Sequence, residues 1–352
     1  MTALHTSIVR SFAGALFLAS VAALSAQSVV TDPVGFTTLT VAAKPASARG
    51  FSYLAVNMTR PTAYRSVIPA GGVSASGSPT VLTFPAGSFT ANQFNGIGNA
   101  SYVEFTNTAN PGVISDIVTT TTNTITLADD VSALLVAGTT TFKIRPHWTF
   151  GTVFGVNNSA GLLGGTNPAA ADNVQIQNAT TGIKTIYYYN TSFNQWRTGF
   201  TDSTNTVIPP DVGMIIERKV TSAVAFTLVG EVKLGSSELS IVGGSPTQNV
   251  NIIPNPYPLA SVTLLNSTLY TANASTGVVG GTNPAAADTL GIFNSGTGVI
   301  TVYYYNTTFN QWRTGFTDSS NVVIPEGASV IITRKSGRPS FNWYVPQPTM
   351  NL

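Results

Sequence analysis

The sequence predicts an all-β protein: two related antiparallel β modules, sandwich-like or barrel-like, the first interrupted by a small inserted β-barrel-like domain, behind an N-terminal signal helix. Three observations lead to this prediction. A 56-residue segment occurs twice, and short runs that alternate apolar residues with Thr or Ser recur between Gly, Pro and Asn. The two copies also stand at unequal distances from similar upstream stretches.

The repeated segment covers residues 164–219 and 280–335, which align without a gap at an offset of 116 and agree at 38 of 56 positions. Repetition this close indicates one supersecondary unit built twice. In each copy, the turn-rich GGTNPAAAD leads to a strand, a Thr-Gly turn, a run of three tyrosines and a Trp-Arg pair. An Ile-Pro corner then precedes a last strand, so we expect about four antiparallel strands and one aromatic hairpin per copy.

The N-terminus carries the parts of a secretory signal peptide within residues 1–26. Arg10 lies in a segment without acids, an apolar run extends from Phe12 to Leu24, and small residues follow. This pattern predicts export to the periplasm, the cell surface or the exterior. No later run reaches about 18 apolar residues, so no integral membrane helix is expected after signal removal.

The spacing of similar stretches predicts the domain organisation. A Val-Gly pair followed by a strand begins at Val34 and again at Val229, yet Gly35 precedes its copy of the repeat by 129 residues and Gly230 by only 50. The difference of 79 residues is the size of a small inserted domain, which exposed loops tolerate. The predicted units are module 1 at 32–70 plus 146–220, an inserted β-domain at 71–145, module 2 at 226–340 and a tail at 341–352.

The inserted segment has its own strand pattern. We expect one helical turn near residues 131–136 and little helix elsewhere. The five expected strands are 80–84, 101–105, 114–118, 123–127 and 140–144.

Composition excludes several classes of partner and site. Charged residues make up 9% of the chain and the net charge is +2, too small for electrostatic capture of nucleic acid. The absence of Cys excludes disulfides, thiolate nucleophiles and Cys-ligated metals. A neutral surface rich in Thr, Asn and Gly favours an extracellular or assembly-forming protein, with self-association or a neutral glycan as the possible partner.

Catalytic, metal and cofactor sites are not predicted. After signal removal His147 is the single His, which is too few for a His-based metal site, and a packed side chain is the expected state of a lone His beside Trp148. The enzymatic alternative is a carboxylate-based hydrolase. The candidate acids of such a hydrolase, however, lie in expected turns, where Asp commonly stabilises the turn by bonding the backbone.

The aromatic hairpins supply the candidate ligand-binding residues. One interpretation is a carbohydrate platform of exposed rings with arginine hydrogen bonds, and the other is core packing across the strands. A neighbouring Arg197–Asp202 pair is expected to be a hairpin ion pair, as is Arg313–Asp318. The binding candidates are Tyr187, Tyr189, Trp196, Arg197, Tyr303, Tyr305, Trp312 and Arg313.

Several stretches together resemble a known family. They are DPVGFTTLTV after the signal, NMTRPTAY at 57–64, IRPHWT at 144–149 and the GGTNPAAAD…W…IPP…ERK pattern. The chain resembles an uncharacterised family of exported β-rich proteins known chiefly from verrucomicrobial and related bacterial genomes. The resemblance implies export and a β-rich build, and it carries over no activity and no site residues.

The expected function is therefore non-catalytic, with structural, adhesive or assembly work in the cell envelope or outside the cell. The first alternative is a carbohydrate-binding protein that uses the duplicated Tyr/Trp hairpins. The second is an outer-membrane β-barrel, which the Pro-rich C-terminal sequence disfavours.

Overall fold

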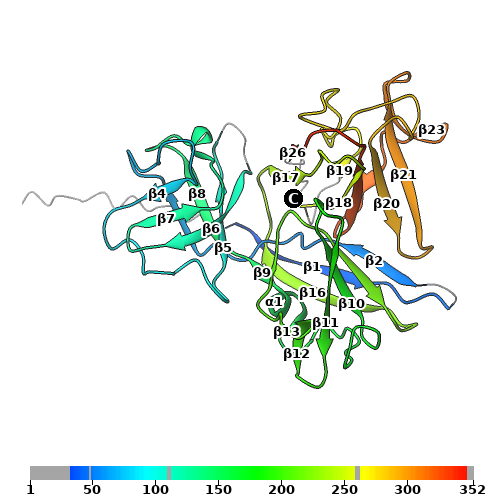
Figure 1. Cartoon of the computed structure of the whole chain (residues 1–352), viewed down its shortest axis with the longest axis horizontal. Coiled ribbons are helices and arrows are strands. Elements are labelled where there is room, and N and C mark those ends of the chain that lie inside the picture. Colours follow the sequence, from blue (N-terminus) through cyan, green and yellow to red (C-terminus); the bar gives the residue numbers. More distant parts are fainter. Residues whose placement is uncertain (1–31, 47–48, 109–111, 258–261, 347–352) are drawn as a thin grey trace, which may run out of the picture. The chain divides into compact units, whose positions relative to one another are not determined.

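The predicted all-β class is confirmed. The computed structural model describes residues 32–46, 49–108, 112–257 and 262–346, and these form antiparallel ladders with one short α-helix (Figure 1). The predicted signal peptide at 1–26 lies outside the described residues. Within the described part of the chain, no helix has the length and apolar character to span a bilayer.

Each copy of the repeat supplies five strands of a six-stranded sheet, and the two sheets have the same strand order. The first sheet runs β13-β12-β11-β10-β15-β2, and the second runs β23-β22-β21-β20-β25-β18. The strands of the first sheet are β2 (Gly50–Leu54), β10 (Asn173–Gln177), β11 (Lys184–Asn190), β12 (Gln195–Thr198), β13 (Thr201–Asp202) and β15 (Met214–Arg218). Those of the second are β18 (Asn249–Pro254), β20 (Thr289–Asn294), β21 (Val299–Asn306), β22 (Gln311–Thr314), β23 (Thr317–Asp318) and β25 (Ser329–Arg334).

Two-stranded ladders accompany both sheets in the same pattern. The longer pairs are β1 (Val34–Val41) with β16 (Val224–Glu231), and β17 (Ser237–Ile241) with β26 (Phe341–Val345). The shorter pairs are β9 (Trp148–Thr149) with β14 (Val207–Ile208), and β19 (Val262–Thr263) with β24 (Val323–Ile324).

These ladders change two expectations from the sequence. Val34-Gly35 and Val229-Gly230 are antiparallel partners, with Gly35 opposite Gly230, and not equivalent starts of two modules. Residues 226–231 therefore belong with β1, ahead of the second sheet. Residues 341–345, expected in the tail, pair with β17. The two similar stretches are thus the paired strands of one ladder.

The inserted segment forms a third sheet with the order β3-β8-β5-β6-β7-β4. All five predicted strands are present, and a sixth, β3, pairs with β8 through Tyr64↔Ile144. The inserted sheet therefore starts before residue 71. The expected helical turn is the 3₁₀ helix η1 (Ser132–Leu134). The strands are β3 (Tyr64–Val67), β4 (Val81–Thr83), β5 (Ser101–Phe105), β6 (Ile114–Thr120), β7 (Thr124–Leu127) and β8 (Thr141–Pro146).

Each sheet has its own cluster of buried apolar side chains. The cluster of the first sheet includes a helix that the sequence did not predict, α1 (Phe150–Phe154), held by a capping box between Thr149 and Thr152. Phe150 and Phe154 lie 5.8 and 5.1 Å from the Trp196 ring, centroid to centroid. Helix α1 thus supplies the support for the first aromatic hairpin.

Candidate functional site

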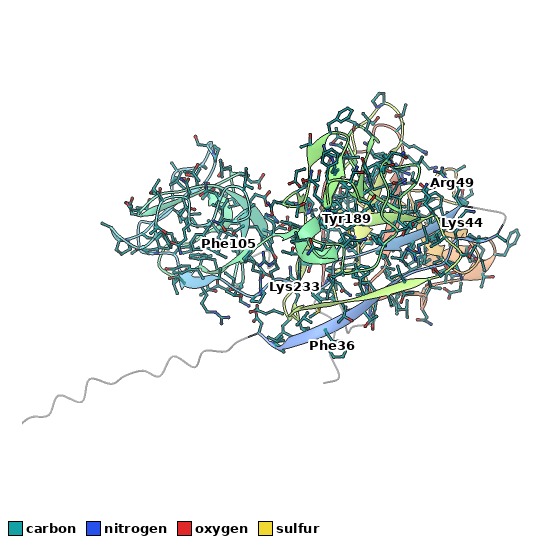
Figure 2. All side chains as sticks on the ribbon, turned by 90° about the horizontal axis from the view of Figure 1, so that it is seen from below. Phe36, Lys44, Arg49, Phe105, Tyr189 and Lys233 are labelled. Carbon is teal, nitrogen blue, oxygen red and sulfur yellow. The ribbon has the colours of Figure 1, made fainter. Side chains whose placement is uncertain are left out.

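The tyrosines and tryptophans of the repeat lie mainly in the cores. In the first sheet, Trp196 is 0% exposed and donates from Nε1 to the Gly155 carbonyl oxygen. Tyr189, which is labelled in Figure 2, is 8% exposed. Tyr187 is half-buried, 4.2 Å from Phe150 between ring centroids. In the second sheet, Trp312 and Tyr303 are buried, and Tyr305 stacks on Tyr270 at 3.5 Å.

The burial of these rings favours core packing over the interpretation as a carbohydrate platform. A sugar ring needs an uncovered aromatic face, and the faces of Trp196 and Trp312 are covered by other side chains of the cores. The two candidate arginines are also buried, at 7% for Arg197 and 8% for Arg313. Core packing across the strands is the state of these residues.

The predicted ion pair between Arg197 and Asp202 does not form, although the two residues are opposite each other in the β12–β13 ladder. Arg197 instead donates to the Phe200 carbonyl oxygen, and Asp202 accepts from the Thr204 N–H at 2.8 Å. The strand ends here, and an Asp at a strand end can bond the backbone two residues on.

The second copy repeats this arrangement. Arg313 donates to the Phe316 carbonyl oxygen, and the Ser320 N–H bonds Asp318 and lowers its pKa.

Phenylalanines at the hairpin turns are the exposed aromatic residues of the repeat. Phe200 is 99% exposed and its counterpart Phe316 is 98% exposed. Phe193 and Phe309, on the preceding turn of each copy, are 62% and 60% exposed. We call Phe193 with Phe200, and Phe309 with Phe316, the aromatic tips.

Local hydrogen bonds and one arginine fix the shape of each tip. In the first copy, Asn190 Oδ1 accepts from the N–H groups of Ser192 and Phe193, which closes the β11–β12 turn. Gly199 takes a positive φ of 54° in the β12–β13 turn, which leaves Phe200 as the outward residue. The Arg197 guanidinium lies 4.2 Å from the centre of the Phe193 ring.

The second tip has the same construction, with Asn306, Gly315 and Arg313 in the equivalent places. In both copies, a single buried arginine therefore joins the two turns of the tip. It stacks on the first phenylalanine and bonds the backbone of the second.

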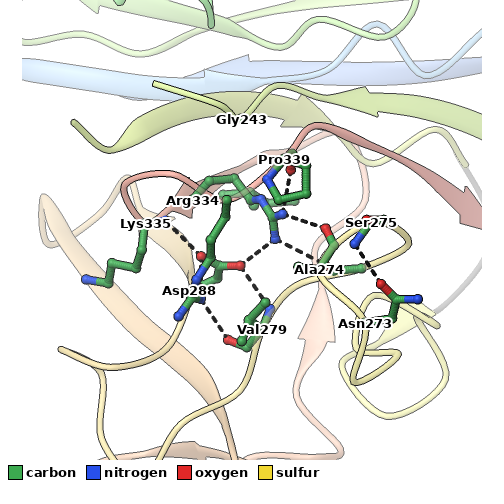
Figure 3. A network of polar contacts seen from close by, with 12 residues as sticks. Gly243, Asn273, Ala274, Ser275, Val279, Asp288, Arg334, Lys335 and Pro339 are labelled. Carbon is green, nitrogen blue, oxygen red and sulfur yellow. Dashed lines mark hydrogen bonds and ion pairs between the residues drawn. The ribbon is translucent and has the colours of Figure 1, made fainter. Parts of the chain in front are cut away.

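The remaining repeated charges have a structural role in a buried network (Figure 3). Asp288 accepts from Val279 N–H at 2.9 Å and Lys335 N–H at 2.8 Å, and it pairs with Arg334 at 2.5 Å and Arg338 at 2.8 Å.

In the first copy, Asp172 bonds Leu163 N–H, Lys219 N–H and Arg218 in the same way. The Asp that ends GGTNPAAAD and the Arg-Lys that ends the repeat are thus partners that tie the loop to the last strand of the sheet.

The single histidine of the described residues and their acidic side chains are the candidate metal ligands. His147 is buried, with its Nε2 2.9 Å from an Asp116 carboxylate oxygen. No group of three or more His, Asp or Glu side chains in the described ranges could hold a metal ion. Comparisons with protein-family models and with curated proteins found no match to this chain.

The repeat is evident in the sequence, but its candidate tyrosines and tryptophans are buried or half-buried, and its exposed rings are phenylalanines. Tyrosine, tryptophan and phenylalanine recur equally in both copies, so recurrence alone cannot separate core rings from exposed ones. Position in the chain could have identified the exposed ring. Gly199-Phe200 lies in the turn between two strands, where a side chain points away from the sheet.

Proposed function

We propose that this chain is an exported, non-catalytic protein of the cell envelope or exterior, with a structural or adhesive role in which the aromatic tips make the contacts. One observation carries the proposal: Phe200 and Phe316 are almost fully exposed at equivalent places in two separate sheets. Covering an exposed phenyl side chain contributes about 1.5–3 kcal/mol, so an exposed phenylalanine kept in both copies favours a contact surface.

The duplication supports an adhesive role because two weak contacts on one chain act together. Once one tip is bound, the second binds at a raised effective concentration, and the combined affinity exceeds that of either tip. The low charge of the chain fits contact with other copies of itself or with a neutral polymer, where ionic steering is not needed. Export rests on the signal-like residues 1–26 and on the family resemblance.

The test compares tip variants with a matched apolar control. Phe200→Ala with Phe316→Ala removes both outermost rings. Ile183→Ala with Val299→Ala removes residues that are 66% and 56% exposed at the other end of β11 and β21. Binding to isolated cell envelopes, and self-association by sedimentation velocity, should fall at least tenfold for the tip variant only.

Two results would count against the proposal. Equal losses in the tip and control variants would show that general surface hydrophobicity causes the association. Recovery of the native protein in the cytosolic fraction of its own cells would remove the export part, whatever the tips do.

A further inference from the structure

A small cavity of about 40 Å³ lies where the three sheets approach one another. Its walls come from the segment after β2, from β5, from the segment that returns from the inserted sheet and from β17. Apolar side chains such as Met58 and Ile208 form much of the wall, and Trp148, Lys233 and Glu238 line it as half-buried residues.

Unpaired polar atoms gather around this cavity. Eight buried side-chain nitrogen or oxygen atoms in the described part of the chain have no hydrogen-bond partner there. Four of them belong to residues that line the cavity: Asn57 Nδ2 and Oδ1, His147 Nδ1 and Ser237 Oγ. The three residues are 2%, 3% and 1% exposed. Buried polar groups are normally paired, so such a concentration indicates a place built to hold hydrogen-bonding groups.

The hydrogen-bonding character of His147 follows from its neighbours. Its Nε2 faces a carboxylate oxygen of Asp116, whose side chain is 64% exposed. An ionised carboxylate only accepts hydrogen bonds, so Nε2 carries a hydrogen, and Nδ1 is an acceptor when the ring is uncharged. The Tyr102 ring packs 4.9 Å from the imidazole and fixes its orientation.

The second half of the chain shows an asparagine of similar placement in a structural role. Asn255 follows β18 as Asn57 follows β2. Its Nδ2 donates to the carbonyl oxygens of Ile324 and Pro325, at 3.0 and 3.2 Å, and its Oδ1 accepts from Tyr257 N–H. The Asn57 amide forms no such hydrogen bonds with the described residues.

Ser237 lies beside Tyr257. The Tyr257 hydroxyl donates to the carbonyl oxygens of Gly235 and Val345. The Ser237 hydroxyl also interacts with this phenol, which opposes the rise in the tyrosine pKa that burial causes. Because Ser237 lines the cavity and a hydroxyl has more than one bonding position, its Oγ can still bond a ligand there.

We propose that this cavity binds hydroxyl groups of a small neutral carbohydrate or polyol. A hydroxyl both donates and accepts, which matches the amide of Asn57, the acceptor Nδ1 of His147 and the Ser237 hydroxyl together. The volume admits about three water-sized groups, such as a hydroxymethyl and a neighbouring hydroxyl.

The charges and the aromatic residue at the cavity restrict the ligand further. Lys233 is 3.2 Å from a Glu104 carboxylate, so its charge is balanced, while Glu238 lines the cavity and disfavours an anion. The half-buried Trp148 indole offers an apolar surface for the C–H groups of a sugar ring. The site is separate from the rings first expected to bind sugar.

The test titrates the purified protein with D-glucose and with glycerol by isothermal calorimetry and ligand-observed NMR. Wild-type protein should show saturable binding. Asn57→Leu and Ser237→Ala should each weaken it by up to about tenfold, the effect of losing a neutral hydrogen bond. Thr120→Val is the matched control, since it removes another buried unpaired hydroxyl that does not line the cavity.

Three results would contradict the proposal or part of it. Unchanged affinity in Asn57→Leu and Ser237→Ala would overturn the proposal, as would a crystal soaked in D-glucose that shows only water in the cavity. Binding of D-glucuronate as tight as that of D-glucose would overturn the restriction to neutral ligands. Circular dichroism identifies any variant that fails to fold, and Ser237→Ala, the smaller change, then carries the test.

Discussion

The two repeat copies present nearly the same hairpin on different supports. In the first sheet, Trp196 packs against Phe150 and Phe154 of α1 and donates to a carbonyl at the end of that helix. In the second sheet, Trp312 packs edge-on to Tyr305, which is stacked on Tyr270. The Tyr–Trp contact occurs in both copies, whereas Phe150, Phe154 and Tyr270 lie outside the 56-residue repeat. Each sheet therefore forms its own core around a common hairpin.

The two copies also differ in their buried charged residues. The first sheet has Glu217 at the place of Thr333, and this 3% exposed carboxylate pairs with Arg49 and Lys219. The second sheet places two arginines on Asp288 where the first places one on Asp172. The exposed tips are among the features that the copies share without change, and their exposure in both sheets is why they carry the proposed contact.

The largest expected effect is on the buried aspartates. Asp288→Asn leaves Arg334, which is fully buried, without its partner charge and should lower the free energy of unfolding by about 3–5 kcal/mol. Asp172→Asn should cost less, because only Arg218 loses an ionic partner. Urea unfolding followed by circular dichroism measures both, with the exposed-turn variant Asp202→Asn as the control. A larger loss for Asp172→Asn would reverse the expected order.

The next effect tests the separate supports of the two hairpins. Phe154→Ala opens a cavity beside Trp196 and should lower the free energy of unfolding by about 3 kcal/mol. Hydrogen exchange should accelerate in β11 and β12 while β21 and β22 keep their protection. Faster exchange in both hairpins would mean that the two cores unfold as one unit.

The pH dependence of the two halves should have opposite signs. Burial raises the pKa of Glu217, but bonds from Lys219 and Arg49 outweigh it, so the pKa is lower than its ordinary value of 4.5. Its stabilisation is present above 4.5 and is lost as pH falls through the lowered pKa. Burial raises the pKa of Glu238, so its favourable protonated state is lost as pH rises above 4.5.

Two glutamine variants measure these signs. Glu217→Gln should be less stable than wild type at pH 7, and the difference should shrink below pH 4.5. Glu238→Gln should be more stable than wild type at pH 7, and that difference should shrink toward pH 4.5. The midpoints of urea unfolding, measured across this pH range, test both expectations. If the two variants responded to pH in the same direction, the opposite signs assigned to Glu217 and Glu238 would be contradicted.

The smallest effect on stability is expected at the aromatic tips. Because Phe200 and Phe316 bury almost no surface in the monomer, replacing either with Ala should change the free energy of unfolding by no more than about 0.5 kcal/mol. A loss above 1.5 kcal/mol on thermal or urea unfolding would show that these rings pack within the monomer, and the contact proposal would lose its basis.

The sequence by itself determined the β class, the duplicated unit and the five main strands of the inserted sheet. These depend on local alternation and on recurrence, both of which can be read along the chain. The sequence also marked Asp172, Arg218 and their counterparts as repeated, but it did not show that residues 46 positions apart form one buried pair.

Only the tertiary structure decided which aromatic rings are covered, where β16 and β26 pair, and which polar atoms meet at the cavity. Covering a ring or pairing a strand edge depends on segments far away in the chain, such as α1 for Trp196 and β1 for β16. Local sequence patterns indicate whether a side chain favours the surface or the core. The burial of Trp196 and the exposure of Phe200, four residues later, were settled by the elements that pack on each.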